Sequence, residues 1–411
     1  MSATFLPSLP FQLSFPLLFG VLLVAGMLGG ELARALRIPR MIGYAVVGFV
    51  FGPITGAMGL GALIDEARIF VDLALGLVLF DLGRRMDLKW MRRDWSLLAT
   101  GLAESLLTFI AVFVTLEALD FRPVLAGIAA AIAMTTSPAV VLLIVHDTHA
   151  EGQVTERALN LCALNGLLAS VIVTIMLGSA HYESRMSLET AVLHPLYLFA
   201  GSLFLGASMA WAARVIARAI ERDREVHFSL LAGLVVAAVG LATLLKLPVI
   251  LALLSFGLFA RNDERGYALL NVSLAPIGRL LYIVLFVITG ASLPAEALVT
   301  GFWGGLALIA ARAAGKLAGV MIVAPLGGLR LQQAAGLGLA LLPMSSLSLL
   351  LQHDIARLYP AFGAGLSAIF LSAIIVMEVA GPLAVQFGLK LAGETIPEGE
   401  ETMTGTGPRA A

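Results

Sequence analysis

Two long apolar stretches of this chain are each interrupted near the middle by polar and helix-breaking residues. The first break lies at residues 133–138, with the sequence AMTTSP, and the second lies at 341–346, with the sequence LLPMSS. Hydrocarbon offers no partner for the backbone groups that such a break releases, so a helix that faces lipid does not carry one. A pair of interrupted spans in corresponding halves of a chain is typical of the binding site of a secondary transporter.

The composition indicates a membrane protein, so we expect the lipid bilayer as a partner. Of the 411 residues, 59% are hydrophobic and 13% are charged, and the mean hydropathy is +0.96, far from the balance of a soluble domain. The net charge of −1 argues against a nucleic acid partner. The sequence holds no motif for a catalytic nucleophile, a cofactor or a metal, so we do not expect an enzyme, a cofactor or a metal site.

Stretches of roughly 17–25 apolar residues can cross a bilayer as helices, and about thirteen of them predict an all-α membrane protein. Lys and Arg are concentrated in the odd-numbered connections and after the last span. This bias predicts a cytoplasmic C-terminus and an N-terminus on the outside. The predicted spans are 15–36, 41–60, 69–86, 95–119, 123–145, 158–180, 193–219, 227–245, 247–260, 273–293, 297–325, 332–353 and 361–391.

The breaks fall in the fifth and the twelfth predicted spans. If the seventh span is a linker, the spans before and after it form two six-helix repeats of inverted topology, and the broken spans are equivalent. The sequence therefore predicts that the two breaks meet around a polar pocket in the middle of the bilayer.

Ionisable residues in the middle of a span are costly, by roughly 2.5–3.5 kcal/mol each, so each is a functional candidate. Glu104 lies in the fourth predicted span, and Arg312 and Lys316 lie on one face of the eleventh. These residues either form a buried ion pair that holds two helices together or exchange protons during transport. Lys316 suits proton exchange better, because arginine stays charged in proteins. Glu378, in the last span, is either a third intramembrane carboxylate or a residue near the cytoplasmic end of its helix.

The breaks also supply hydroxyls and free carbonyls that can bind an ion together with the partial charges of the half-helix ends. The candidate ion-binding hydroxyls are those of Thr135, Thr136, Ser137, Ser345 and Ser346.

The chain resembles the monovalent cation:proton antiporters, and in particular their Kef-type branch. Residues 36–53 (LRIPRMIGYAVVGFVFGP) are similar to the opening motif of that branch, and 79–83 (LFDLG), 86–88 (MDL) and 136–139 (TSPA) resemble later segments. The resemblance covers nearly all of residues 15–393. It implies a homodimer in the inner, plasma membrane that exchanges a monovalent cation, Na⁺ or K⁺, for protons.

The resemblance also implies a division of the chain into two domains. A core with crossed broken helices would comprise 95–180 and 297–391, and a scaffold that carries the dimer contact would comprise 15–86 and 193–293. The core would move like an elevator and carry the ion site across the membrane. A segment at 1–14 would precede the domain, and we expect 394–411 to be a disordered cytoplasmic tail.

The sequence departs from the family pattern at the ion site. The family carries Asp-Asp or Asn-Asp in the sixth span, whereas this chain has Asn165 followed by Gly166. Ser137 stands where some relatives carry an aspartate. Lys316 fits the basic residue of the span before the second broken helix, and Glu104 fits an acidic position that some relatives use at the ion site.

Three readings follow from this departure. In the first, cation:proton exchange is kept, and Glu104 replaces the missing aspartate beside Asn165, Ser137 and Thr136. In the second, the fold is kept, but the surplus of basic groups selects an anion or a small organic solute. In the third, the protein is channel-like or does not transport.

Overall fold

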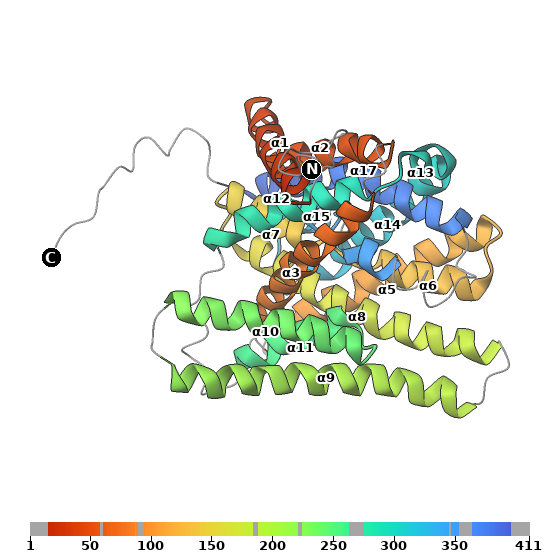
Figure 1. Cartoon of the computed structure of the whole chain (residues 1–411). Coiled ribbons are helices and arrows are strands. Elements are labelled where there is room, and N and C mark those ends of the chain that lie inside the picture. Colours follow the sequence, from red (N-terminus) through yellow and green to blue (C-terminus); the bar gives the residue numbers. More distant parts are fainter. Residues whose placement is uncertain are drawn as a thin grey trace, which may run out of the picture.

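The computed structural model describes a helical protein, and none of the described residues lies in a strand (Figure 1). Nine helical stretches in this part of the chain are long and apolar enough to cross a membrane, with the broken stretch Pro123–Asp147 taken as one. The predicted all-α membrane fold is confirmed. The described residues are 15–57, 61–86, 88, 94–183, 188–220, 224–262, 275–344, 347–352 and 364–395.

Within the described residues, each predicted span is occupied by one helix, by two half-helices or, at 297–325, by the short α13 followed by α14. The helices often extend beyond the apolar stretch, as in α3, which begins at Gly61, and α8, which begins at Gln153. The unbroken helices are α1 (Phe15–Ala35), α2 (Arg40–Ala57), α3 (Gly61–Arg85), α5 (Trp95–Ala118), α8 (Gln153–Glu183), α9 (Leu188–Ala219), α10 (Arg224–Leu244), α11 (Val249–Asn262), α12 (Ala275–Ala291), α13 (Ala295–Thr300), α14 (Phe302–Val323) and α17 (Ala364–Ala392).

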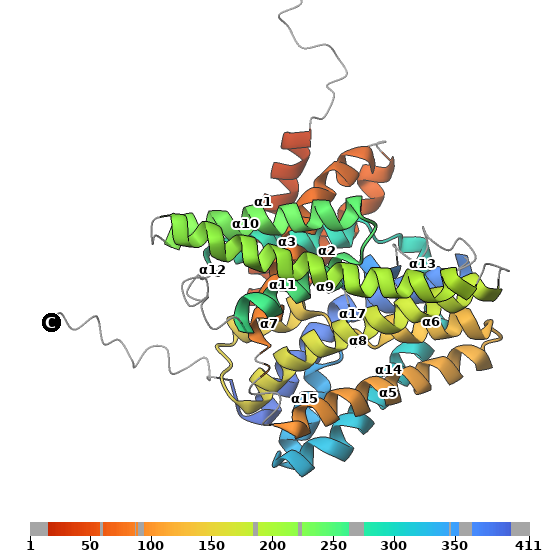
Figure 2. The same cartoon turned by 90° about the horizontal axis from the view of Figure 1, so that it is seen from below.

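The helices pack in two groups. Helix α5 lies along α14, and α17 packs on α14 and on α15 (Leu331–Ala340). In the other group α2 packs on α1 and α12, and α11 packs on α3 and α9. Helix α8 contacts members of both groups. Figure 2 shows α5, α14 and α15 on one side of the molecule and α1, α2 and α10 on the other.

An ion pair joins the two groups at one end of the bundle. Arg40, the first residue of α2, places Nη1 3.8 Å from Oδ1 of Asp147, the last residue of α7 (Pro138–Asp147). The Nε atom of Arg40 also lies 3.5 Å from Oε1 of Glu31 on α1. Arg40 is therefore shared between a carboxylate of its own group and a carboxylate of the other.

The C-terminal end of α17 is fastened to the beginning of α8. The carboxylate of Glu394 accepts hydrogen bonds of 2.8 Å each from the backbone N–H of Val154, the backbone N–H of Thr155 and the hydroxyl of Thr155. The two backbone N–H groups are among those that the first turn of a helix leaves without a partner. Gly152 has φ +157° beside this carboxylate, and a Cβ there would lie 2.2 Å from Glu394 Cδ. Glu394 therefore has a defined position against α8, although we expected a disordered tail to begin at that residue.

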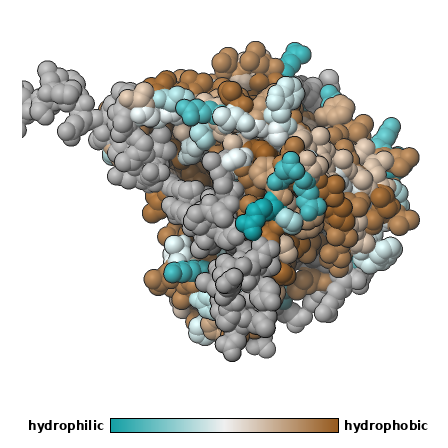
Figure 3. Space-filling model, turned by 90° about the vertical axis from the view of Figure 1, so that its right-hand side faces the viewer, coloured by the Kyte–Doolittle hydropathy of each residue, from teal (hydrophilic) through white to brown (hydrophobic). Residues whose placement is uncertain are grey.

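Much of the outer surface is apolar. Figure 3 shows one face on which hydrophobic side chains cover most of the described area and hydrophilic ones gather in a few places. The exposed large side chains include Leu28, Leu32, Phe204, Trp211 and Trp303. Water would not favour such a surface, but the hydrocarbon of a bilayer does.

Candidate functional site

The first break separates α6 (Pro123–Ala133) from α7. Pro138 is the first residue of α7, where its missing N–H costs nothing, but it cannot continue a helix from the preceding turn. Ser137 before it has extended backbone angles, φ −72° and ψ 107°. Residues 134–137 are buried, so their backbone groups need partners inside the protein.

The second break follows α15, which ends at Ala340, and Pro343 lies within it. The chain is helical again at 347–352. The predicted ligands Ser345 and Ser346 lie outside the described residues. We call residues 134–137 and 341–344 together the crossing.

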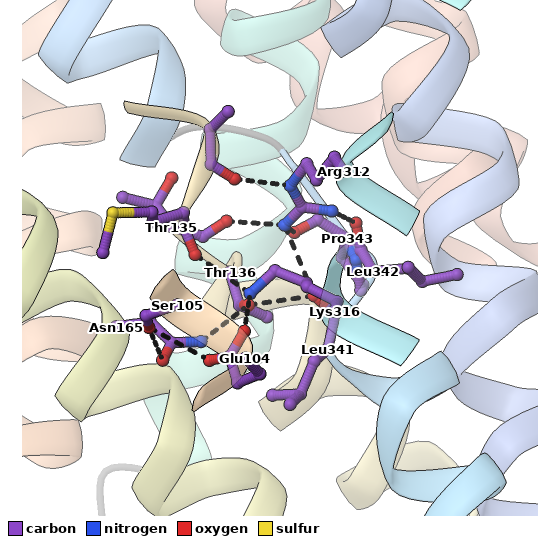
Figure 4. A network of polar contacts seen from close by, with 12 residues as sticks. Glu104, Ser105, Thr135, Thr136, Asn165, Arg312, Lys316, Leu341, Leu342 and Pro343 are labelled. Atoms are coloured by element: carbon purple, nitrogen blue, oxygen red, sulfur yellow. Dashed lines mark hydrogen bonds and ion pairs between the residues drawn. The ribbon is translucent and has the colours of Figure 1, made fainter. Parts of the chain in front are cut away.

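The two breaks are bonded directly to each other (Figure 4). The N–H of Ser137 donates to the carbonyl of Pro343 at 2.9 Å, and the hydroxyl of Thr136 donates to the carbonyl of Leu341 at 2.9 Å. The hydroxyls of Thr135 and Ser348 are 2.7 Å apart. The breaks therefore meet inside the protein, as the sequence led us to expect.

Arg312 holds the crossing together from α14. Its guanidinium donates to the carbonyls of Ala133 (2.8 Å) and Thr135 (2.6 Å) in the first break. It also donates to three consecutive carbonyls of the second break, at residues 341–343. The side chain is buried, and its positive charge faces the negative ends of the α6 and α15 dipoles. Arg312 is thus a structural cation whose donors are directed at backbone carbonyls.

Lys316, one turn along the same face of α14, pairs with a carboxylate. Its Nζ lies 2.9 Å from Oε2 of Glu104 and donates to the carbonyl of Met134 at 2.9 Å. Both side chains are 0% exposed. A Cβ at Gly319 would lie 2.3 Å from the Cα of Glu104. Because Gly319 lacks a side chain, α14 and α5 approach closely enough for this pair to form.

A chain of polar side chains connects Glu104 to the second break. The hydroxyl of Ser105 lies 3.3 Å from Glu104 Oε1 and 3.2 Å from Asn165 Oδ1. The amide of Asn165 donates to Thr136 Oγ1 at 3.2 Å, and Thr136 donates to the carbonyl of Leu341. All four side chains are buried. The result is a continuous polar path from Glu104 on α5, through Asn165 on α8 and Thr136 in the first break, to the carbonyl of Leu341 in the second break.

Ser137 occupies the N-terminal end of α7. Its hydroxyl is buried and has no hydrogen-bond partner among the described residues. A hydroxyl in such a place either meets a residue beyond the described ranges or is available to an ion or a water molecule.

Gly166 lies next to Asn165 but faces an apolar wall. A Cβ at this position would lie 3.5 Å from Leu254 of α11 and 3.6 Å from Leu347. Those are ordinary contact distances, so a side chain can be accommodated here. Gly166 itself contributes no polar side chain to the site.

Glu378 is buried on α17, with 3% of its surface exposed. It lies one turn before Gly381, where a Cβ would approach Pro343 Cα to 3.1 Å. Glu378 is therefore a buried carboxylate on a helix that packs against the second break, and its depth in a membrane remains a prediction.

Sequence reasoning missed two side chains of the site. Ser105 follows Glu104, and Ser348 lies two residues after Ser346. A search for polar residues within one turn of each candidate would have found both. In the described part of the chain, no three His, Cys, Asp or Glu residues are grouped as they would be to hold a metal ion.

Residues 19–389 match the family described as sodium/hydrogen exchanger, transmembrane. None of the curated proteins compared matches the chain. Two solved structures with a similar fold are both of the sodium proton antiporter MjNhaP1 from Methanocaldococcus jannaschii. One, at pH 8, has 17% sequence identity and a TM-score of 0.63, and it covers 92% of this chain and 95% of that chain. The other, from electron microscopy, has 16% identity and a TM-score of 0.65, with 93% and 98% covered.

Proposed function

The chain belongs to the transmembrane sodium/hydrogen exchanger family, and we propose that it exchanges a monovalent cation, Na⁺ or K⁺, for protons. The observation that carries this proposal is the buried pair of Glu104 and Lys316 beside the crossing. In this proposal Glu104 supplies the carboxylate, because this chain has Gly166 where the family carries an aspartate. The ion site is atypical in that respect.

The pair suggests how the cation and the proton compete. A cation that binds the Glu104 carboxylate lies close to the ammonium of Lys316. Two unit charges 4 Å apart repel by about 4 kcal/mol at an effective dielectric constant near 20. Release of one proton from Lys316 removes this repulsion, and its return expels the cation. One cation then exchanges for one proton, without net movement of charge.

The packing supports an elevator-like movement. Both broken helices, α5, α14 and α17 lie in one group of packed helices, while α1–α3 and α9–α12 lie in the other. The proposed core would slide against the proposed scaffold, and α8 contacts both. A homodimer through the scaffold, an inner-membrane location, an outside N-terminus, a cytoplasmic C-terminus and membership of the Kef-type branch all remain parts of the proposal.

The geometry weakens the alternative of an anion or small organic substrate. That reading needs basic side chains with donors free for the substrate. Arg312 instead directs its donors at five backbone carbonyls, and Lys316 bonds to Glu104 and to a carbonyl. The cation reading is therefore the better supported one.

Transport by the purified full-length protein in liposomes with an imposed pH gradient tests the proposal. We expect Na⁺ or K⁺ to collapse the gradient, and Glu104→Gln to abolish that effect. Glu156→Gln is the matched control, because Glu156 is an exposed acid on α8. Collapse by anions alone would favour the alternative substrate, and no response to any salt would favour a protein that does not transport. If the wild-type protein does not exchange cations and Gly166→Asp creates exchange, the glycine indicates that this chain has a function other than cation:proton exchange.

A further inference from the structure

We propose that a sodium ion binds between Glu104 Oε1, Ser105 Oγ and Asn165 Oδ1, and that Ser105 is an ion ligand that selects Na⁺ over K⁺. This inference rests on the proposed function and assigns a place and a ligand set to its cation. It is carried by the polarity of the hydrogen-bond chain and by the two distances from Ser105 Oγ to the oxygens of Glu104 and Asn165.

The polarity of the chain is fixed at its far end. The carbonyl of Leu341 can only accept, so the hydroxyl proton of Thr136 is used there. Thr136 Oγ1 must then accept from Asn165 Nδ2, which turns Asn165 Oδ1 toward Ser105. Ser105 has a single proton and faces two acceptors, Asn165 Oδ1 and Glu104 Oε1. Ser105 can therefore donate to only one of these two oxygens.

The separations of Ser105 Oγ from the other two oxygens suit a bound cation, and as hydrogen bonds they are long. Ser105 Oγ lies 3.2 Å from Asn165 Oδ1 and 3.3 Å from Glu104 Oε1. Hydrogen bonds between a hydroxyl and an oxygen are usually about 2.5–3.0 Å long. Neighbouring oxygens around a six-coordinate ion are separated by the ion–oxygen distance times √2, so these separations correspond to about 2.3 Å. That value is near the lower end of the range for Ca²⁺, about 2.3–2.6 Å, an ion of nearly the same radius as Na⁺.

The Glu104 carboxylate divides its two oxygens between two partners. Oε2 lies 2.9 Å from Lys316 Nζ, while Oε1 faces Ser105. A cation at Oε1 therefore binds without first displacing Lys316 and raises the electrostatic energy of its ammonium. This places the proton-releasing group and the cation on opposite edges of one carboxylate.

Close packing keeps the three oxygens near each other. Glu104 and Ser105 lie on α5 and Asn165 lies on α8. A Cβ at Gly101 of α5 would lie 2.4 Å from Leu164 Cδ2 of α8. Helices in such contact do not separate easily to admit a larger ion, so the site disfavours K⁺.

The test compares Ser105→Ala with wild-type full-length protein in liposomes, with NaCl or KCl as the probe. We expect the half-saturating Na⁺ concentration to rise about tenfold or more, the factor for losing one polar contact to a charged group. The maximal rate should change little, and the preference for Na⁺ over K⁺ should shrink. Thr100→Val is the control. It removes a buried hydroxyl from the same helix, and that hydroxyl donates to the carbonyl of Ser96.

A second readout does not depend on transport. Na⁺ should raise the unfolding temperature of the wild-type protein in detergent relative to choline, and Ser105→Ala should require about tenfold more Na⁺ for the same rise. If the alanine variant does not fold, Ser105→Cys replaces it in both measurements. It keeps the size of the side chain, and its soft sulfur is a poor ligand for a hard cation.

The outcomes separate this inference from the proposed function. If Glu104→Gln abolishes exchange and Ser105→Ala leaves the Na⁺ dependence and the preference for Na⁺ unchanged, Ser105 is not a ligand and the proposed function stands. If the wild-type protein shows neither exchange nor stabilisation by Na⁺, both are overturned.

Discussion

Arg312 and Lys316 carry the same charge on one face of α14, yet their surroundings give them different roles. Arg312 faces backbone carbonyls of both breaks, and its planar fork suits several acceptors at once. Lys316 faces the carboxylate of Glu104, to which another cation can also bind. The arginine therefore bonds the two breaks together, whereas the response of the lysine to a cation is part of the proposed function.

The Glu104–Lys316 pair makes a prediction about stability. Glu104→Gln and Lys316→Gln each leave one buried charge without its partner, which should cost about 3–5 kcal/mol. The double variant removes both charges and should unfold at a higher temperature than either single variant. Thermal unfolding of the purified proteins in detergent measures this, and exchange should be lost in all three. A double variant destabilised by the sum of the single effects would contradict a direct pair.

At the scale of single residues, the sequence predicted which charged side chains lie near the crossing, but not which atoms they contact. Glu104, Arg312 and Lys316 were singled out because charges are rare inside spans, and the structure places all three beside the crossing. The hydroxyl of Ser105 carries no such signal, because serine is tolerated in a membrane helix by bonding to its own backbone. The roles of all these residues in ion binding remain predictions.

The packing of α14 on α5 depends on residues without side chains. Cβ atoms at Gly315 and Gly319 would lie 2.5 Å from Thr108 Cα and 2.3 Å from Glu104 Cα. The backbones are therefore in direct contact, and the ion pair sits where they touch. The sequence did not single out these glycines, because spacing alone does not say which helix is the neighbour.

Gly319→Ala should push the two helices apart. Overpacking of this kind costs about 1–3 kcal/mol, so we expect a lower unfolding temperature and weaker cation-driven exchange. Gly240→Ala is the matched control, because a Cβ at Gly240 in α10 would meet nothing within 4 Å. That variant should be neutral or slightly stabilised. Equal effects of the two substitutions would show that close approach at Gly319 is unimportant.

At the scale of the whole molecule, the apolar pattern predicted the order of the helices because each span must be apolar to cross the bilayer. The helix ends differ, as at Gly61 and Gln153, because helical hydrogen bonding continues into polar residues that a hydropathy pattern excludes. The packing of α8 against both groups depends on contacts between distant spans, which one sequence does not reveal.

The ion pair between Arg40 and Asp147 lies on the boundary that an elevator movement would cross. Cysteines at both positions, joined by a flexible and cleavable thiol cross-linker, should stop exchange in liposomes, and cleavage should restore it. The control joins cysteines at Glu31 and Arg34, which are one turn apart on α1. Full exchange by the cross-linked protein would mean that α2 and α7 do not move apart during transport.

The bonds of Glu394 to the first turn of α8 have a practical consequence for shortened versions of the chain. A version that stops at Ala392 would remove the acceptor of three hydrogen-bond donors at the start of α8. A version that ends after Thr395 keeps the carboxylate in place. Affinity tags and reporter proteins therefore belong beyond that point, where they leave the bonds between Glu394 and the first turn of α8 intact.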